Sequence, residues 1–277
     1  MQPGIIFVVI MTRTVKRIKM KKGIIFIIPA IVALTSCSLF DDCIEGNGNV
    51  VTEERSAEPI TAIANSTSFQ VIYVRDDDYS ITVEAESNIL PYIETEIKGG
   101  SLEVKTIRGT HCLRYSVTPV ITVTAPFISE LINSGSGDFV ADALEGEELK
   151  IISSGSGNIV AGEILTGDLM IIISGSGDVT TDYAVTELFS ITLSGSGDLD
   201  VIGEAGNGKF VVSGSGSVYA DEFSVDEARA TLSGSGSVHT LVNVSLDAII
   251  SGSGNIYLYG DPEVNLIRTG SGRIINQ

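Results

Sequence analysis

The chain has 277 residues, of which 43% are hydrophobic, so it is long and apolar enough to bury a core. It carries 35 Asp and Glu residues against 17 Lys and Arg residues, a net charge of −18 at pH 7. A surface this acidic repels phosphate backbones, which argues against nucleic-acid binding. With no Trp, two His and three Cys, the chain lacks the ligands for a His-rich metal site, a Cys-x-x-Cys-His haem site or a zinc ribbon.

The first 36 residues are typical of an export signal. Lys21 and Lys22 precede an apolar run, residues 24–34, which is too short to span a bilayer as a helix but has the length of a signal-peptide hydrophobic region. The run ends in Leu-Thr-Ser-Cys at residues 34–37. This tetrapeptide resembles the lipobox of bacterial lipoproteins, in which the chain is cleaved before the Cys and the Cys is lipidated.

We therefore predict that residues 1–36 are removed and that Cys37 is lipidated. Acyl chains on Cys37 would hold the protein on a membrane, and residues 37–58 are predicted to contain a short polar tether. Met20 is the expected start codon, with residues 1–19 an over-extended gene start. The predicted location is the cell envelope, with the outer membrane favoured and its periplasmic and outer faces both left open.

Two further cysteines, Cys43 and Cys112, are left over. In an oxidising compartment they could form a disulfide. The sequence does not show whether their Cα atoms come close enough to be bridged. Both the paired and the unpaired state therefore remain open.

The body of the chain is a repeat with a period near 20 residues. The tetrapeptide Ser-Gly-Ser-Gly recurs along it, and a variant copy, Thr-Gly-Ser-Gly, follows the last of these. The copies begin at Ser134, Ser154, Ser174, Ser194, Ser213, Ser233, Ser251 and Thr269. A fixed period of this size is typical of a solenoid, whereas a propeller blade needs about 40 residues.

Apolar and polar residues alternate on both sides of each tetrapeptide, which predicts half-buried strands. If the first residue of each copy is position 0, positions −3, −1 and +5 are mainly apolar, and positions −4 and +4 are mainly polar. Equivalent positions should stack about 4.8 Å apart, so the apolar ladders form the core. The glycines at +1 and +3 should point inward and let the wall approach the axis. The serines at 0 and +2 should point outward and bond between coils.

These patterns predict an all-β protein whose residues 127–277 form a right-handed single-stranded parallel β-helix with about 20 residues per coil. The segments between position +8 and the next −6 contain Gly and Pro and are interpreted as turns. Residues 59–126 are predicted to be a β-rich part that caps one end, with a turn or one helical turn at residues 88–92. Its expected strands are Phe69–Val74, Ser80–Glu84, Glu94–Ile97, Leu102–Thr106 and Val120–Thr124.

Several short motifs together resemble the head GIN domain family, named as putative auto-transporter adhesins. They are Ser-Phe-Gln-Val at 68–71, the segment 83–93, Lys-Gly-Gly-Ser-Leu at 98–102, Val-Thr-Ala-Pro at 123–126 and Gly-Ser-Gly-Asn-Ile at 155–159. The resemblance covers residues 61–272. It implies a β-helical fold in the envelope of Gram-negative bacteria and supplies no catalytic motif. The chain departs from the family pattern at residues 65–67, Asn-Ser-Thr, where a Gly-containing unit is expected.

Two files of side chains are candidates for a ligand face. Position +4 brings together Asp138, Asn158, Asp178 and Asp198. Like charges stacked at sheet spacing repel one another, which a bound Ca²⁺ would relieve. The favoured interpretation is that they are turn residues on a solvated edge, so no metal site is predicted.

The second file, at position +6, contains Tyr219, His239 and Tyr257. Aromatic rings on an outer face could stack on sugar rings. Ordinary cross-strand pairing explains the same pattern and is favoured.

The sequence thus predicts a non-catalytic, adhesin-like surface or scaffold module of the cell envelope, with no cofactor. The predicted partners are a membrane, through Cys37, and a glycan or a surface protein. A second copy of the chain could also bind through the C-terminal coil. A carbohydrate-active enzyme on a β-helix and an envelope assembly factor are the alternatives.

Overall fold

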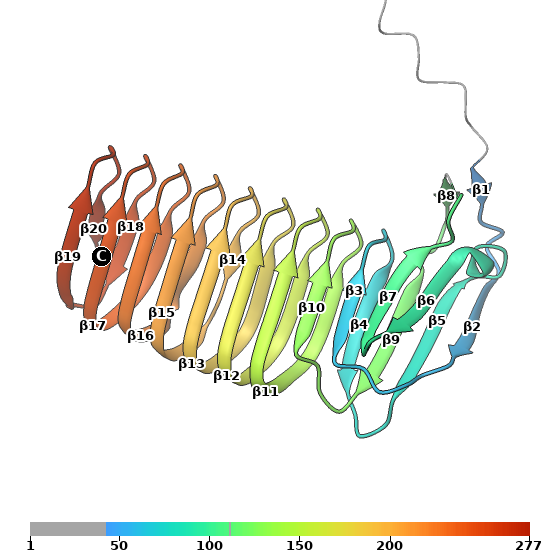
Figure 1. The fold of residues 1–277 in the computed structure, drawn as a ribbon. Coiled ribbons are helices and arrows are strands. Elements are labelled where there is room, and N and C mark those ends of the chain that lie inside the picture. Colours follow the sequence, from blue (N-terminus) through green and yellow to red (C-terminus); the bar gives the residue numbers. More distant parts are fainter. Residues whose placement is uncertain (1–42, 111) are drawn as a thin grey trace, which may run out of the picture. The chain divides into compact units, whose positions relative to one another are not determined.

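The computed structural model describes residues 43–110 and 112–277. The predicted export signal, the lipidated Cys37 and the start codon lie outside the described residues. Strands make up most of the described chain and belong to one 18-stranded sheet and one 2-stranded sheet (Figure 1). The helical element among them is a single short turn, η1 (Leu90–Tyr92), and none of the described helical structure is long and apolar enough to cross a membrane.

The elements lie along the chain in the order that Figure 1 labels. The N-terminal strands are β1 (Ile44–Glu45), β2 (Val50–Arg55), β3 (Ala62–Asn65), β4 (Gln70–Arg75), β5 (Ser80–Glu86), β6 (Ile93–Lys98), β7 (Ser101–Thr106), β8 (Leu113–Arg114) and β9 (Val120–Ala125). The repeat contains β10 (Glu130–Asn133), β11 (Phe139–Ser153), β12 (Ile159–Ile173), β13 (Val179–Leu193), β14 (Leu199–Asp200), β15 (Gly203–Val212), β16 (Val218–Leu232), β17 (Val238–Ile250), β18 (Ile256–Tyr259), β19 (Glu263–Arg268) and β20 (Ile274–Asn276).

The repeat forms the predicted parallel β-helix. Every strand pairing from β10 to β20 is parallel, and each strand pairs with the equivalent strand of the next coil. Leu131 lies beside Ile151, which lies beside Ile171. The tetrapeptides form a row of projecting loops along one edge of the solenoid (Figure 1). Equivalent side chains are therefore stacked, as the period of the sequence predicts.

The core follows the predicted ladders. At position −3, Leu131, Ile151 and Phe210 have no exposed surface, and at position +5 the same holds for Phe139 and Ile159. Burial of about 100 Å² of apolar surface contributes roughly 2.5 kcal/mol, and each coil repeats this contribution at the same positions. The stacked ladders are thus the main source of stability.

Five of the seven segments interpreted as turns between +8 and the next −6 are instead continuous strand, whereas the chain leaves the strand between Asp200 and Gly203 and between Tyr259 and Glu263. In the first full coil, Leu144 pairs with Ile164 and Gly146 with Thr166, so the parallel ladder continues through the bends. The coil changes direction within the 15-residue strand β11. Glycine was a misleading signal in the continuous coils, because parallel neighbours satisfy the backbone groups there, whereas Gly260 and Pro262 do lie in a connection between strands.

The glycines of the tetrapeptide are required because the backbone of the preceding coil is close, and not only because the wall approaches the axis. The predicted alternation holds, since Ser134 and Ser136 are exposed and Gly137 is buried. A Cβ atom on Gly155, however, would lie 1.8 Å from the carbonyl oxygen of Gly135 in the preceding coil. The spacing between coils, rather than the width of the core, thus excludes a side chain.

Backbone groups, rather than serine hydroxyls, tie successive loops together. The amides of Ser154 and Gly155 both donate to the carbonyl of Asn133, at 2.9 and 3.2 Å. The same bifurcated arrangement recurs in every later coil except that of Ser233, where the Ser233 amide alone donates to the carbonyl of Val212. The predicted hydroxyl pairing between coils is present in part: Ser134 and Ser154 lie 3.4 Å apart through their Oγ atoms.

The departure from the family pattern at residues 65–67 has a structural explanation. Asn65 pairs with Asn133, so the segment 66–69 is an additional copy of the loop in which Thr67 and Phe69 replace the glycines. The Phe69 ring packs edge-on against Tyr115, 6.0 Å between centroids. Side chains are tolerated here because no further repeat coil lies on that side.

The N-terminal part continues both sides of the solenoid and contains antiparallel strands. β3 pairs with β10 and β7, and β4 pairs with β11 and β9, all in parallel. The pairs β2–β5, β5–β9 and β6–β7 are antiparallel. The five strands expected in residues 59–126 are present within one or two residues at each end, and η1 is the expected helical turn. Strand β3 was not predicted.

The predicted tether of residues 37–58 is wrong for its described part. Residues 50–55 form β2, which pairs with β5. Cys43 and Cys112 form a disulfide with their Cα atoms 4.5 Å apart, beside the short parallel pair β1–β8. A polar composition misled the prediction because this segment is held by its partners rather than by its own apolar side chains.

A buried carboxylate fixes the loops around this disulfide. Glu86 has no exposed surface and accepts hydrogen bonds from Ser116 Oγ at 2.8 Å, the Ser116 amide at 3.0 Å and the Gly48 amide at 2.6 Å. These donors, the Ser116 hydroxyl first, lower the pKa of Glu86 against the opposing effect of burial. Glu86 therefore stays ionised and joins three segments.

Candidate functional site

The +4 file is a continuous hydrogen-bonded ladder. Asp138 Oδ1 accepts the amide of Asn158 at 2.9 Å, and Asn158 Oδ1 accepts the amide of Asp178 at 3.0 Å. Asp178 Oδ1 accepts a hydrogen bond from the amide of Asp198 at 2.8 Å. Asp198 Oδ1 in turn accepts one from the amide of Ser217 at 2.6 Å. Each side chain thus bonds the backbone of the next coil, which explains why position +4 needs a short acceptor.

This ladder gives the acidic residues of the file a structural role. A backbone N–H dipole directed at a carboxylate offsets part of the repulsion between stacked charges. Ser217, Ser237 and Asn255 continue the same pattern without charge. Among the described residues no group of three or more His, Cys, Asp or Glu side chains is arranged to hold a metal ion. The arrangement favours the interpretation that these are connecting residues of the loop.

The +6 file is brought together as a stack of rings. The ring centroids of Tyr219 and His239 are 5.0 Å apart, and those of His239 and Tyr257 are 4.3 Å apart with planes 17° from parallel. Partial burial lowers the pKa of His239, while Asp221 opposes this shift. Because His239 lies between the two tyrosines, the ring faces that meet within the stack are not free to stack on a sugar. The geometry favours cross-strand pairing.

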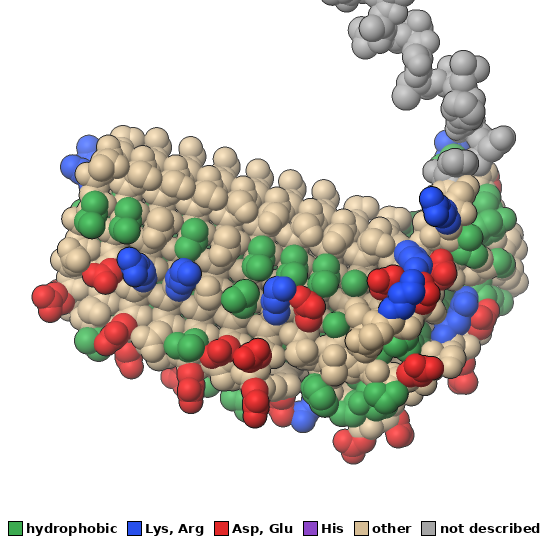
Figure 2. Space-filling view, in the orientation of Figure 1, with side chains coloured by type: hydrophobic (Ala, Val, Ile, Leu, Met, Phe, Trp, Pro, Cys, Tyr) green, Lys and Arg blue, Asp and Glu red, His purple; other side chains and the backbone are tan. Residues whose placement is uncertain are grey.

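The edge formed by the serine loops is uncharged. In Figure 2 it is a broad band with few charged or hydrophobic side chains. Its glycines are explained by the spacing between coils, and its amides bond the preceding coil. The band therefore has a complete structural explanation without a ligand.

A different surface, which we call the lateral face, has the features of a binding surface. It is formed by β6, β7, β3, β10 and the C-terminal halves of the long strands up to β19, paired side by side. Position −2 projects from it as an aliphatic row interrupted by two threonines. The row is Ile132, Ile152, Ile172, Thr192, Val211, Thr231, Ile249 and Ile267. Figure 2 shows hydrophobic side chains spaced along this face.

The aliphatic row is accessible to solvent. Seven of its eight members are half-buried, and the last, Ile267, is 58% exposed. The neighbouring outward positions −4 and −6 add Met170 and Leu188, exposed at 45% and 48%. Parallel sheets are normally covered on both faces, and contiguous exposed apolar surface is typical of interaction sites. Sequence reasoning missed this row, although the apolar residues at −2 were visible once the outward positions were identified.

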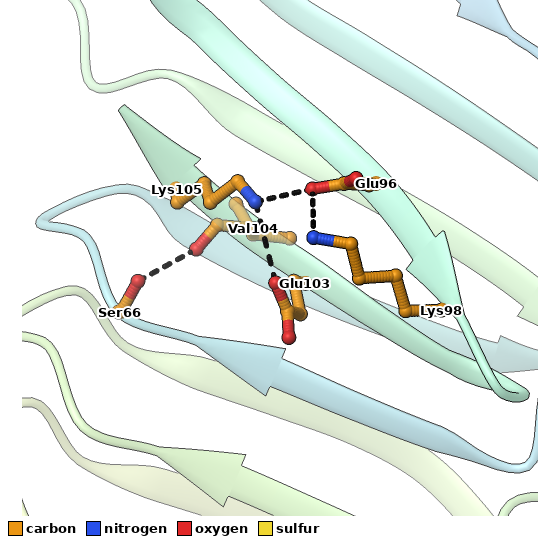
Figure 3. A network of polar contacts seen from close by, with 6 residues as sticks. All are labelled: Ser66, Glu96, Lys98, Glu103, Val104 and Lys105. Atoms are coloured by element: carbon orange, nitrogen blue, oxygen red, sulfur yellow. Dashed lines mark hydrogen bonds and ion pairs between the residues drawn. The ribbon is translucent and has the colours of Figure 1, made fainter. Parts of the chain in front are cut away.

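Charges on the lateral face are paired near its N-terminal end. Lys105 contacts both Glu96 and Glu103, and Lys98 lies 2.9 Å from the same Glu96 (Figure 3). Beside this network the Ser66 hydroxyl donates to the carbonyl of Val104. The hydrogen bond from Lys105 lowers the pKa of Glu96, and the same contact raises the pKa of Lys105.

Further along the face, two basic residues lie side by side. Lys209 and Arg229 are exposed and in register at position −4. A groove of about 380 Å³ lies against them. Nearer the N-terminal part the same position holds Lys150, which pairs with Glu130 at 2.8 Å. The sequence signal for this site was the occurrence of Lys209 and Arg229 at the same position, −4, of successive repeats. This signal was not used in the sequence-based prediction.

The described carboxylates with shifted pKa values do not resemble a general acid. The pKa values of Glu86 and Glu96 are both lowered, whereas an acid that protonates a substrate near neutral pH needs a raised pKa. Glu86 is also buried and fully engaged with Ser116 and Gly48. These carboxylates are structural.

Comparison with known proteins gives two kinds of match. The sequence family described as putative auto-transporter adhesin, head GIN domain, matches residues 59–180 and 159–262. No curated protein matches the sequence.

Solved structures match nearly the whole described chain. A putative adhesin from Parabacteroides merdae has 23% identity and a TM-score of 0.75, covering 85% of this chain and 99% of its own. A putative lipid binding protein from Parabacteroides distasonis has 26% identity and a TM-score of 0.75, covering 84% and 99%. A putative adhesin from the same species has 21% identity and a TM-score of 0.76, covering 85% and 100%. These similarities establish the fold.

Proposed function

Because the chain belongs to the family of putative auto-transporter adhesins with a head GIN domain, we propose that it is a lipid-anchored adhesin-like module of the cell envelope. In this proposal Cys37 attaches the protein to the outer membrane, and the β-helix presents its lateral face to a glycan or surface protein. The module binds without catalysis. Putative adhesins are also among the solved structures that share its fold.

The observation that carries this proposal is the exposed aliphatic row of the lateral face. A solenoid does not need apolar side chains at outward positions, because its core is complete without them. The row nevertheless recurs from Ile132 to Ile267 at the spacing of the coils. A long, flat and partly apolar surface fits an extended partner better than a small substrate, for which an enclosed pocket is usual.

Binding to a glycan array and to whole cells tests the role of the lateral face. Ile132→Asp combined with Ile172→Asp places charges at two outward positions on strands that are not neighbours and is expected to lower binding at least tenfold with little change in the melting temperature. Val160→Asp is the matched control, because Val160 is also exposed but lies outside the lateral face. Equal loss in the control, or no loss in the double variant, would count against this role.

Lipidation is tested separately. Expression of the full chain with palmitate labelling and mass spectrometry should find a mature protein that begins at an acylated Cys37. A Cys37→Ser variant should no longer be found in the membrane fraction. Detection of residues before Cys37 in the mature protein would reject the anchor.

Self-association through the C-terminal coil is a further proposal. Val264 and Leu266 are 42% and 41% exposed in β19, whereas equivalent residues of earlier coils, such as Leu246 and Leu131, are fully buried. A second copy stacked on this edge would cover them. Sedimentation velocity should show concentration-dependent dimers that Leu266→Asp abolishes, and a monomer at all concentrations would refute the idea.

A further inference from the structure

A groove on the lateral face runs between two outward rows of side chains. It has a volume of about 380 Å³. Lys209 and Arg229, at position −4, line one side, and Asn207 and Glu227, at position −6, line the other. The backbone around Gly208 lies between the two rows. Because both rows follow the coils, the groove is directed along the solenoid axis.

The two basic side chains have no partner within the described chain. Neither Lys209 nor Arg229 makes an ion pair or a hydrogen bond with another described residue. The next member of their row, Asp247, lies in register with Arg229 and also lines the groove, but its carboxylate accepts a hydrogen bond from Asn265 at 3.2 Å and forms no ion pair with Arg229. Adjacent like charges on neighbouring strands are destabilising. The pair is therefore maintained at a cost to stability that a bound anion would remove.

This arrangement contrasts with the other lysines of the lateral face. Lys98, Lys105 and Lys150 each have a carboxylate within 3.0 Å. The described chain is strongly acidic, so a carboxylate partner for Lys209 would be easy to supply. Lys209 and Arg229 both line the groove without such a carboxylate partner, which points to a ligand rather than to structural support.

The opposite wall restricts the chemistry of that ligand. Glu227 would repel a simple anion such as phosphate, but it can accept hydrogen bonds from sugar hydroxyls. Asn207 can both donate and accept. An arginine and a lysine together suit a planar carboxylate. A ligand with a carboxylate on one side and hydroxyls on the other satisfies both walls.

We propose that the groove binds an acidic glycan, with a uronic acid carboxylate held by Lys209 and Arg229 and neighbouring hydroxyls held by Glu227 and Asn207. The inference rests on the proposed adhesin-like function and names its ligand class. A second groove lined by residues of the same rows, including Lys150 and Asp168, lies nearer the N-terminal part. A linear glycan would extend along the axis in that direction.

The test is calorimetric titration of the full-length protein with trigalacturonate. The variant Lys209→Gln/Arg229→Gln is expected to bind at least tenfold more weakly, with a melting temperature no lower than that of the wild type because two adjacent like charges are removed. Lys98→Gln is the control, since it removes a paired lysine from the N-terminal end of the lateral face, away from both grooves, and it should bind within twofold of the wild type. Affinity of the wild type should fall as salt rises. Equal affinity of the double variant and the wild type would overturn the proposal.

Glu227→Ala separates a sugar from a simple anion. If Glu227 accepts sugar hydroxyls, the variant binds trigalacturonate several-fold more weakly. If the site merely attracts negative charge, removing Glu227 strengthens binding, and the proposal fails. The methyl ester of trigalacturonate should bind at least tenfold more weakly than the acid. Preferential binding of inorganic phosphate or of phosphatidylglycerol vesicles would overturn the assignment to a glycan.

The same titrations distinguish this inference from the proposed function. If the wild type binds other glycans on the array but not trigalacturonate, the acidic-glycan assignment is wrong and the adhesin-like role stands. If it binds neither glycans nor cells, the proposed function fails as well.

Discussion

The repeat and the N-terminal part share one sheet but are stabilised in different ways. In the repeat every pairing is parallel and each contact recurs in the next coil. In the N-terminal part antiparallel pairs, the Cys43–Cys112 disulfide and the buried Glu86 each occur once. The Tyr73 hydroxyl likewise donates to the carbonyl of Ala125 across 52 positions of the chain.

This difference shows how each region tolerates change. In a ladder many equivalent contacts contribute to stability, so losing one outward contact lowers the free energy of unfolding only slightly. A single cross-link or buried carboxylate has no equivalent to replace it. The exception in the repeat is the glycine pair, because there the neighbouring backbone leaves no space. Four experiments test this comparison.

The largest effect is expected from the disulfide. Changing both Cys43 and Cys112 to Ser opens a link across 69 positions, which should lower the free energy of unfolding by about 4 kcal/mol. Urea unfolding of the full chain measures the effect, and reduced wild-type protein should match the variant. An unchanged unfolding midpoint in both would show that the disulfide does not stabilise the N-terminal part.

A single methyl group in a loop should cost nearly as much. The Cβ of Gly175→Ala would lie 1.9 Å from the carbonyl oxygen of Gly155, so two coils must move apart, at about 3 kcal/mol. Gly146→Ala is the control, because its nearest atom would be 3.7 Å away, and it should be neutral or slightly stabilising. Thermal unfolding compares the two, and equal melting temperatures would contradict the coil-spacing argument.

The acidic ladder should contribute less at each step. Asp178→Ala removes the acceptor of the Asp198 amide and should lower stability by about 1 kcal/mol. Asp178→Asn keeps an acceptor, as Asn158 does naturally, and should lie within about 0.5 kcal/mol of the wild type. Chemical unfolding measures both. The melting temperature should be the same with Ca²⁺ and with chelator, and a calcium-dependent rise would show that the ladder binds metal.

The effect expected from Glu86 is a change in how stability depends on pH. Hydrogen bonds from the Ser116 hydroxyl and from the Gly48 and Ser116 amides lower its pKa in the folded protein. Its stabilising contribution is therefore present above the unfolded pKa of about 4.3 and is lost as pH falls through the folded pKa. Melting temperatures from pH 7 to pH 3 should fall less steeply in Glu86→Gln than in the wild type. Parallel curves would exclude this role.

Much of the solenoid could be predicted because its signals are local and repeated. Alternation around Ser134 and its equivalents identified the inward and outward positions, and the period identified the stacking. The bends near Gly146 and Gly162 could not be predicted as strand, because their hydrogen-bond partners are a coil away. β2 was missed for the same reason, since only its pairing with β5 makes it a strand.

The candidate site shows the same division. The residues of the +4 and +6 files were correctly placed in common rows, but only the structure shows that Asp178 bonds the next backbone amide and that His239 is stacked between two tyrosines. The lateral face was not recognised, because its importance depends on which outward rows are covered.

The sequence by itself determined the repeat, the core ladders and the family, because a period of about 20 residues allows only one efficient way to bury aliphatic side chains. The tertiary structure alone decided which glycines are indispensable, where polar side chains find partners, and that Lys209 and Arg229 line a groove unpaired. Those properties depend on distances between coils, which are set by backbone hydrogen bonds between residues far apart in the chain.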